Sequence, residues 1–241
     1  MVSAPSTRRG VCHAADVQLV LWDIDGTLVD SAGHGRHAFD DAFEAVVGRP
    51  LEGEYEFAGR TDNQIARTML EGVAGADGHL PRVLEELASA LERRKDLIRE
   101  EGRAYPGVEE ALAAIAARDD IAQSLLTGNL EANAVVKLAA FGLDRWLDFE
   151  LGAFGSDPHE ARSDLVAVAR ERAEAKLGVT VDPVLVGDTP LDVQAAREAG
   201  ARAVAVMTGF ASEKELRASE PDALLKDLSD TESALAAITG R

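Results

Sequence analysis

Two carboxylates separated by one residue follow an apolar run near the start of the chain. Residues 17–22 come directly before Asp23, and Asp25 is followed by Gly26. Burying a charge is costly unless it is paired or bound to a metal, so these acids indicate chemistry rather than packing. One carboxylate can attack phosphorus, and the other can serve as acid and base. Gly26 supplies a turn, which allows the Asp25 side chain to point in a different direction from that of Asp23.

A second pair of acids follows another apolar run. Residues 184–186 lead into Gly187 and Asp188, and Asp192 comes four residues later, where Pro190 suits the first turn of a helix. The helix dipole explains an acid at Asp192 but not one at Asp188. If the two pairs meet, their charges repel one another unless a cation lies between them.

A third segment offers polar groups suited to a phosphate. Thr127 has a hydroxyl, Gly128 allows close approach to its backbone, and Asn129 precedes a helix that we expect from Glu131. Backbone N–H groups at the start of a helix favour an anion. By itself, however, this pattern also fits a strand followed by a capped helix.

These segments need a scaffold that brings them together. Short apolar runs alternate with helical patterns, which predicts an α/β fold with a parallel sheet covered by helices on both faces. We expect strands at Val17–Trp22, Ile121–Leu126, Leu147–Leu151, Pro183–Val186, Arg202–Met207 and Ala223–Leu225. We expect helices between them at Val108–Ala117, Glu131–Phe141, Glu160–Leu177 and Leu191–Ala199. The polar segments then lie at the carboxyl ends of strands, where open α/β sheets bind ligands.

The segment 33–104 is too long for a simple strand–helix–strand connection. Its pattern predicts helices at Gly35–Val47, Asp62–Glu71 and Leu80–Arg99, with Thr61 as the N-cap of the second. We interpret residues 33–104 as an all-helical cap domain inserted into a core domain formed by residues 17–32 and 105–241.

Composition limits the partners of the chain. Its 241 residues have a formal net charge of −18, which disfavours nucleic acid and anionic membrane surfaces. Cys12 is the only cysteine, so a reduced cytoplasmic setting is the simplest expectation. Residues 1–16 lack the apolar stretch of a signal peptide, and we expect them to form a disordered extension. We expect a monomer or a homodimer.

Taken together, the motifs resemble those of the haloacid dehalogenase (HAD) superfamily. Residues 23–27 (Asp-Ile-Asp-Gly-Thr) are similar to its first motif, residues 125–129 to its second and residues 187–192 to its fourth. They occur in the family's order, and the resemblance extends over about residues 17–210. It implies a Rossmann-like parallel sheet with a helical cap, as in the phosphoglycolate-phosphatase-like subgroup.

The resemblance also implies catalytic roles. Asp23 would be the nucleophile and Asp25 the acid and base, while Thr127, Gly128 and Asn129 would bind the phosphoryl group. Family members have a cation some 23–26 residues before the fourth motif. Arg162 lies 26 residues before Asp188 and is our choice, although the family more often has a lysine there. Lys176 is the competitor, but it falls late in the same expected helix.

The cofactor implied is Mg²⁺, a hard cation that prefers oxygen ligands. The resemblance implies ligation by Asp23, the backbone carbonyl of Asp25 and Asp188, with Asp192 orienting metal-bound water. In the cap, residues 59–62 are similar to a segment that touches the substrate in phosphoglycolate-phosphatase-like members. Arg60 would there meet a substrate carboxylate, although an exposed loop arginine is an equally good interpretation.

We therefore expect a Mg²⁺-dependent phosphatase that hydrolyses a small phosphorylated metabolite through an aspartyl-phosphate. The alternative is a phosphosugar mutase similar to β-phosphoglucomutase, which shares all four motifs. A dehalogenase is disfavoured, because that branch of the family lacks the second aspartate of the first motif. A phosphonate hydrolase is also disfavoured, because it needs a lysine in the cap, where only Lys95 is available and lies in a run of charged residues. A non-catalytic binding protein on the same fold is a further alternative.

Overall fold

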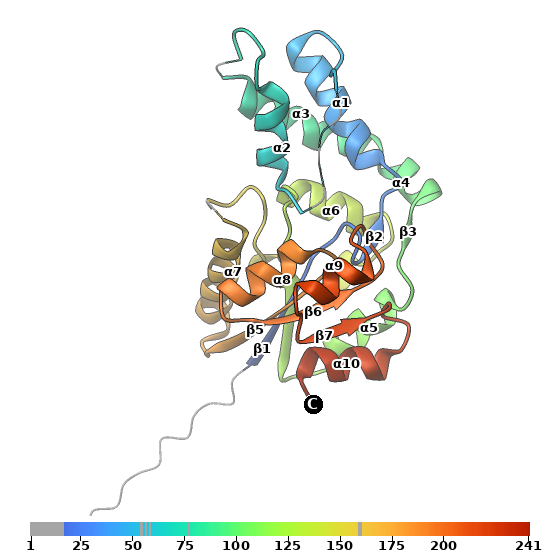
Figure 1. Ribbon diagram of the computed structural model, residues 1–241, viewed down its shortest axis with the longest axis vertical. Coiled ribbons are helices and arrows are strands. Elements are labelled where there is room, and N and C mark those ends of the chain that lie inside the picture. Colours follow the sequence, from blue (N-terminus) through green and yellow to red (C-terminus); the bar gives the residue numbers. More distant parts are fainter. Residues whose placement is uncertain (1–16, 54, 56, 58, 77, 159–160) are drawn as a thin grey trace, which may run out of the picture.

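A five-stranded parallel sheet lies at the centre of the computed structural model (Figure 1). Its strand order is β4-β1-β5-β6-β7. The strands are β1 (Val17–Trp22), β4 (Ile121–Leu125), β5 (Val181–Gly187), β6 (Arg202–Val206) and β7 (Ala223–Leu225). The structure describes residues 17–241 except 54, 56, 58, 77 and 159–160, so the expected disorder of residues 1–16 lies outside the described residues.

Helices cover both faces of the sheet because successive side chains of each buried strand point to opposite sides. Val20 and Trp22 of β1 pack in one cluster with α5, α6 and α10, whereas Leu19 and Leu21 pack in another with α7, α8 and α9. These helices are α5 (Val108–Ala116), α6 (Glu131–Ala139), α7 (Arg162–Leu177), α8 (Pro190–Glu198), α9 (Glu213–Ala218) and α10 (Thr231–Thr239). The expected doubly covered parallel sheet is therefore confirmed.

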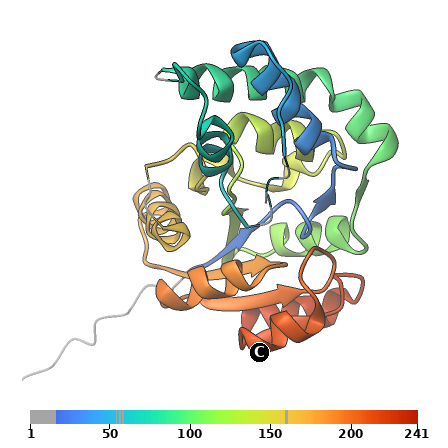
Figure 2. The same cartoon turned by 45° about the horizontal axis from the view of Figure 1, so that its top comes forward.

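Four of the helices between β1 and β4 form a separate layer above the carboxyl ends of the strands (Figures 1 and 2). They are α1 (His34–Val47), α2 (Asp62–Leu70), α3 (His79–Arg93) and α4 (Lys95–Glu101). Their apolar faces share a third cluster around Phe43, Met69 and Leu91, which also takes in Val136 and Ala140 from the α6 region. Thr61 caps α2 as predicted, through a capping box with Gln64.

The two chain segments that enter and leave this layer pair with one another. β2 (Val29–Asp30) and β3 (Arg103–Ala104) form a short antiparallel ladder, and Arg103 and Asp30 form an ion pair of 2.8 Å. This ladder has no counterpart in the sequence prediction, because it is too short to produce a periodic pattern. It closes the base of the four-helix layer against the sheet.

Two of the predicted elements differ from the structure, and the sequence prediction does not include α9 or α10. Leu147–Leu151 is not a strand: it leads into a 3₁₀ turn, η2 (Phe149–Leu151), after the turn η1 (Asp144–Trp146). Asp148 starts η2 by accepting a hydrogen bond from the Glu150 N–H, and an isolated bridge from Leu126 to Ala153 takes the place of a strand. The long helix expected over 80–99 is divided at Arg94 into α3 and α4.

Candidate active site

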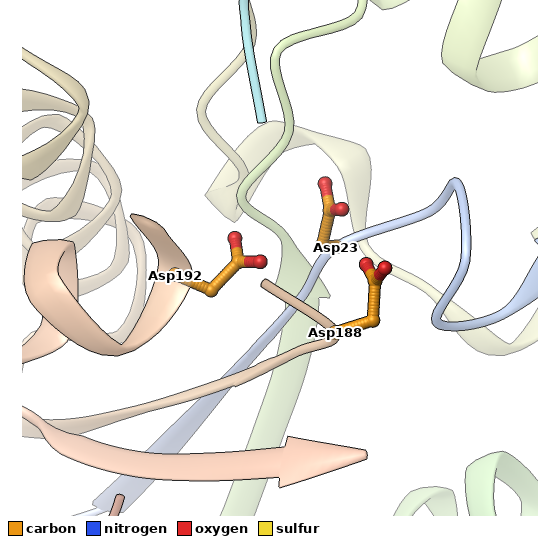
Figure 3. A group of neighbouring side chains, drawn as sticks. All are labelled: Asp23, Asp188 and Asp192. Atoms are coloured by element: carbon orange, nitrogen blue, oxygen red, sulfur yellow. The ribbon is translucent and has the colours of Figure 1, made fainter. Parts of the chain in front are cut away.

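Three acidic side chains converge where β1 and β5 end (Figure 3). Asp23 follows β1, Asp188 follows β5, and Asp192 lies in the first turn of α8. One carboxylate oxygen from each lies within 4.8 Å of the others. β1 and β5 are adjacent parallel strands, with Trp22 opposite Val186, so residues that follow each strand meet at one edge of the sheet.

Asp188 lies in a cradle that has no room for additional side chains. It is fully buried, and its oxygens accept hydrogen bonds from the Thr27 hydroxyl (3.2 Å) and the Phe210 N–H (2.9 Å). A Cβ added to Gly26 or Gly209 would lie 2.4 or 1.9 Å from an Asp188 oxygen. Gly26 has a φ of +85°, so it also forms the turn that the sequence predicts after Asp25.

Arg162 is the cation in direct contact with these acids. Its Nη2 lies 3.0 Å from an Asp23 oxygen and 2.6 Å from an Asp192 oxygen. Its Nε is buried and has no hydrogen-bond partner among the residues that the structure describes, which leaves a donor that a bound anion can use. The competing residue Lys176 instead pairs with Asp148 and Glu150 at the far end of α7.

Asp192 has its carboxylate oxygens occupied within the protein. One accepts hydrogen bonds from the N–H and the hydroxyl of Thr189 (3.0 and 2.6 Å), and the other accepts from Arg162. Asp192 is therefore less available than Asp23 and Asp188 as a direct ligand of a cation. This fits the expectation that Asp192 orients metal-bound water rather than binding the metal directly.

Burial and mutual repulsion shape the charge of this group. Burial raises the pKa of Asp23 to about 7; Arg162 opposes the shift, and the charges of Asp192 and Asp25 add to it. Burial, with the charges of Asp192 and Asp23, raises the pKa of Asp188 to about 8. Burial lowers the pKa of Arg162, but the two aspartates outweigh it and raise that pKa overall. Ionised carboxylates at this spacing call for a further cation, and the donor set of hard oxygens suits a divalent ion such as Mg²⁺.

A second polar network surrounds Asp25 and Thr127. The buried Asn129 donates its side-chain amide to the Thr127 hydroxyl oxygen (2.8 Å) and to Asp25 (2.9 Å). Lys137 Nζ donates to both Asp25 oxygens (2.8 and 2.6 Å) and to the Asn129 carbonyl oxygen (2.7 Å). Asn129, expected to touch substrate, thus has its amide engaged in joining Thr127 to Asp25, although it still lines the pocket.

Lys137 is the site residue that the sequence analysis missed. It lies in the last turn of α6, a common place for a lysine because the helix dipole favours a cation there. Its exposed fraction is only 6%, however, and it contacts a residue 112 positions earlier in the chain. The sequence carried one usable signal: Asn133 and Lys137 are four residues apart, so they share the helix face that leads back to Asn129.

The four-helix layer is held against this network. Asp62, the first residue of α2, is buried and accepts hydrogen bonds from the Leu130 N–H (2.8 Å) and the Asn133 amide (2.7 Å) of the α6 region. The Asp62 N–H donates to the Gly128 carbonyl (2.8 Å). A Cβ on Gly128 would lie 2.3 Å from the Arg60 carbonyl oxygen, so this glycine allows the two backbones to touch.

A pocket of about 660 Å³ lies between the four-helix layer and the sheet. Asp23, Asp25, Thr127, Gly128 and Arg162 line its floor. Arg60 lines it from the helical layer, and its side chain is exposed. All of the catalytic residues expected from the sequence therefore face one cavity.

Comparisons with known proteins give the chain a family. Residues 17–200 match the model of the haloacid dehalogenase-like hydrolases. The chain is 28% identical to a "probable phosphatase IndB" of Dickeya dadantii, over 91% of this chain and 94% of the relative. It is 32% identical to a plasmid-encoded phosphoglycolate phosphatase of Cupriavidus necator, over 87% of this chain and 89% of the relative.

A solved structure shares the fold. The crystal structure of a "predicted phosphoglycolate phosphatase" from Haemophilus somnus 129pt aligns with a TM-score of 0.66 at 18% identity, covering 92% of this chain and 99% of its own. The family match spans the first and fourth motifs, and the strand ends that carry them form one acidic site. The chain belongs to the haloacid dehalogenase-like hydrolases and is a phosphatase of that family.

Proposed function

We propose that this protein is a Mg²⁺-dependent phosphatase that hydrolyses a small phosphorylated metabolite through an aspartyl-phosphate on Asp23. The observation that carries the proposal is the meeting of Asp23 and Asp188 beside Arg162, whose buried Nε has no partner within the described part of the chain. Two acids and a free guanidinium donor provide for both a cation and the phosphoryl oxygens.

The substrate phosphoryl group binds between Asp23 and the Thr127 loop. The Thr127 hydroxyl, the Gly128 N–H and Arg162 stabilise the charge spread over its equatorial oxygens. A carboxylate oxygen of Asp23 attacks phosphorus, the bond from phosphorus to the ester oxygen breaks, and Asp25 donates a proton to the departing alcohol. Asp25 then takes a proton from water, which attacks the aspartyl-phosphate and releases inorganic phosphate.

Mg²⁺, held by Asp23, the Asp25 carbonyl and Asp188, would offset the negative charge that otherwise keeps the nucleophile and the phosphate apart. Asn129 and Lys137 position Asp25 through their hydrogen bonds to its carboxylate. Asp192 holds Arg162 and remains available to metal-bound water.

We also propose that residues 33–104 act as a cap domain over a core of residues 17–32 and 105–241. The separate apolar cluster of α1–α4 supports this division, as does the pocket between these helices and the sheet. A cap in contact with the Thr127 loop excludes water from the attacked phosphorus. The expected cytoplasmic location is part of the same proposal; no helix within the described ranges has the length and apolarity to span a bilayer.

The experiment is a phosphate-release assay on a panel of phosphorylated metabolites, with Mg²⁺ and with EDTA. We expect release that requires the metal, and its loss in Asp23→Asn with the fold retained by circular dichroism. Asp119→Asn is the matched control, since Asp119 is exposed and lies outside the pocket. Full activity of Asp23→Asn would refute the nucleophile. Turnover that depends on a sugar bisphosphate without net phosphate release would instead identify a mutase.

A further inference from the structure

The pocket above the catalytic residues is lined by aromatic rings. Phe39, Tyr55 and Phe57 face it from the helical layer, and Tyr105 and Phe210 face it from the core. Its volume of about 660 Å³ falls within the range of about 300–1,000 Å³ that is usual for sites of drug-sized ligands. A phosphate with a two-carbon acid attached would leave much of this aromatic lining without a partner.

The rings of the helical layer are held in place by contacts with one another and with Arg36. The Phe39 and Phe57 rings meet edge to face, with centroids 5.4 Å apart. The Arg36 guanidinium lies 4.4 Å from the centroid of the Phe57 ring, and its Nη2 donates to the Tyr55 carbonyl (2.9 Å). The Phe57 ring and the backbone of Tyr55 are thereby connected to α1.

Phe210 stands out on the core side. Its exposed fraction of 69% is the highest of any large apolar side chain in the described part of the protein. Its backbone N–H donates to Asp188, so the ring is tied to the site while its surface remains in water. Because Phe210 also lines the pocket, its exposed ring adds to the aromatic surface that a ligand in the pocket can contact.

The charged side chains of the pocket also favour an uncharged ring over an acidic group on the substrate. Its cations in the described lining are Arg36, Arg60, Lys137 and Arg162. Lys137 and Arg162 are paired with carboxylates, Arg36 is held by Phe57 and Tyr55, and Arg60 also has a partner within the protein. An uncharged aromatic ring fits this lining without drawing on any of these cations.

We propose that the alcohol released by this enzyme carries a planar aromatic or heteroaromatic ring, which packs against Phe57 and Phe210, as in a nucleoside 5′-monophosphate. This inference rests on the proposed phosphatase function and names its substrate class. The net reaction is hydrolysis: the ester bond to phosphorus is replaced by a bond to the water oxygen, and the nucleoside leaves with a proton from Asp25.

The test compares substrates with the same leaving oxygen. Uridine 5′-monophosphate and adenosine 5′-monophosphate differ from ribose 5-phosphate by their nucleobase. A further substrate, 2-phosphoglycolate, represents the small acidic alternative. We expect kcat/KM for at least one nucleotide to exceed that for ribose 5-phosphate by roughly tenfold or more, as stacking on aromatic side chains provides. Equal or higher kcat/KM for ribose 5-phosphate or 2-phosphoglycolate would overturn the inference.

Variants assign the preference to the rings. Phe57→Leu and Phe210→Leu keep the apolar bulk and remove the ring, so the ratio of kcat/KM for the nucleotide to kcat/KM for ribose 5-phosphate should fall towards one. Leu97→Ala is the control, because Leu97 is 40% exposed on α4 and lies outside the pocket. A preference that is unchanged in both phenylalanine variants would contradict the assignment.

Binding separates this inference from the proposed function. Calorimetric titration of wild-type protein with uridine 5′-monophosphate and ribose 5-phosphate in EDTA reports the ring contact without turnover. If the protein binds the nucleotide more tightly than ribose 5-phosphate but releases phosphate from no substrate, the phosphatase proposal is wrong and the proposed ring site is supported. If the protein releases phosphate but prefers the nucleotide in neither binding nor turnover, the phosphatase proposal is supported and the ring site is wrong.

Discussion

At the scale of single residues, the site depends on cations that hold acids in place. Arg162 joins Asp23 to Asp192, and Lys137 joins Asp25 to Asn129. The resemblance to the family pointed to Arg162, because family members have a cation some 23–26 residues before the fourth motif, and the structure places its guanidinium beside Asp23. Lys137 was not identified, because a lysine in the last turn of a helix is ordinarily explained by the helix itself.

Replacing Arg162 by lysine tests the role of its guanidinium. Arg162→Lys keeps the positive charge near Asp23 but removes Nε and the fork that spans two acids, so kcat/KM should fall by about 10²–10³-fold. Steady-state kinetics measure the loss. Arg172→Lys is the control, because Arg172 forms a two-pronged pair with Asp157 outside the pocket. An equal effect of both substitutions would point to stability alone.

Replacing Lys137 tests whether it positions the acid and base. Lys137→Met leaves Asp25 without its ammonium donor, so kcat should fall by roughly 10²-fold with a smaller change in KM. Lys137→Arg should recover part of kcat. Lys176→Met serves as the control on an exposed lysine. A rise in KM with kcat unchanged would assign Lys137 to substrate binding instead.

At the scale of elements, a capping interaction joins the helical layer to the core. Asp62 begins α2, yet it accepts hydrogen bonds from Leu130 and Asn133 at the start of α6. Burial raises its pKa, while the positive charge of Lys137 acts in the opposite direction. Thr61 is the N-cap of α2, as its sequence pattern predicts, but that pattern does not show that the next residue also caps a helix of the core.

Removing the Asp62 carboxylate should loosen this junction. Asp62→Ala leaves the Leu130 N–H and the Asn133 amide unsatisfied, at a cost of about 1–3 kcal/mol for each buried group. We expect faster hydrogen exchange at the start of α6 and a higher KM, because the α2 contact that closes the pocket is weakened. Asp96→Ala, on the exposed surface of α4, should change neither. Unchanged exchange in Asp62→Ala would show that packing alone holds the layer.

At the scale of the whole molecule, the acidic site opposes folding when no cation is bound. The pKa values of Asp23 and Asp188 are raised to about 7 and about 8. The folded protein therefore holds protons that the unfolded chain, with carboxyl pKa values near 4, has already released. Stability from these groups is present below about pH 4 and is lost as the pH rises towards 8.

The metal-free protein should thus lose stability from pH 5 to pH 8, by up to about 1.4 kcal/mol per pH unit for each group. Mg²⁺ should reverse the trend, because it binds the ionised carboxylates and competes with protons. Denaturant unfolding in EDTA and in Mg²⁺ measures both slopes. Asp188→Asn should flatten the EDTA slope and abolish stabilisation by Mg²⁺. Stability in EDTA that rises over this range would contradict the assigned pKa shifts.

Local patterns in the sequence determined the strands of the sheet, the helices α5 to α8 on its faces, and the strand ends that carry Asp23, Thr127 and Asp188. Hydrophobic periodicity and turn residues act over a few positions, so these features can be read without coordinates. Only the tertiary structure decided that Lys137 contacts Asp25, that Arg162 binds Asp192, and that residues 149–151 form a 3₁₀ turn. These outcomes depend on packing between segments that are distant in the chain, such as Asp25 and Lys137, which lie 112 positions apart. They also depend on electrostatics, because a charged side chain is buried at tolerable cost only where a partner compensates for its lost hydration.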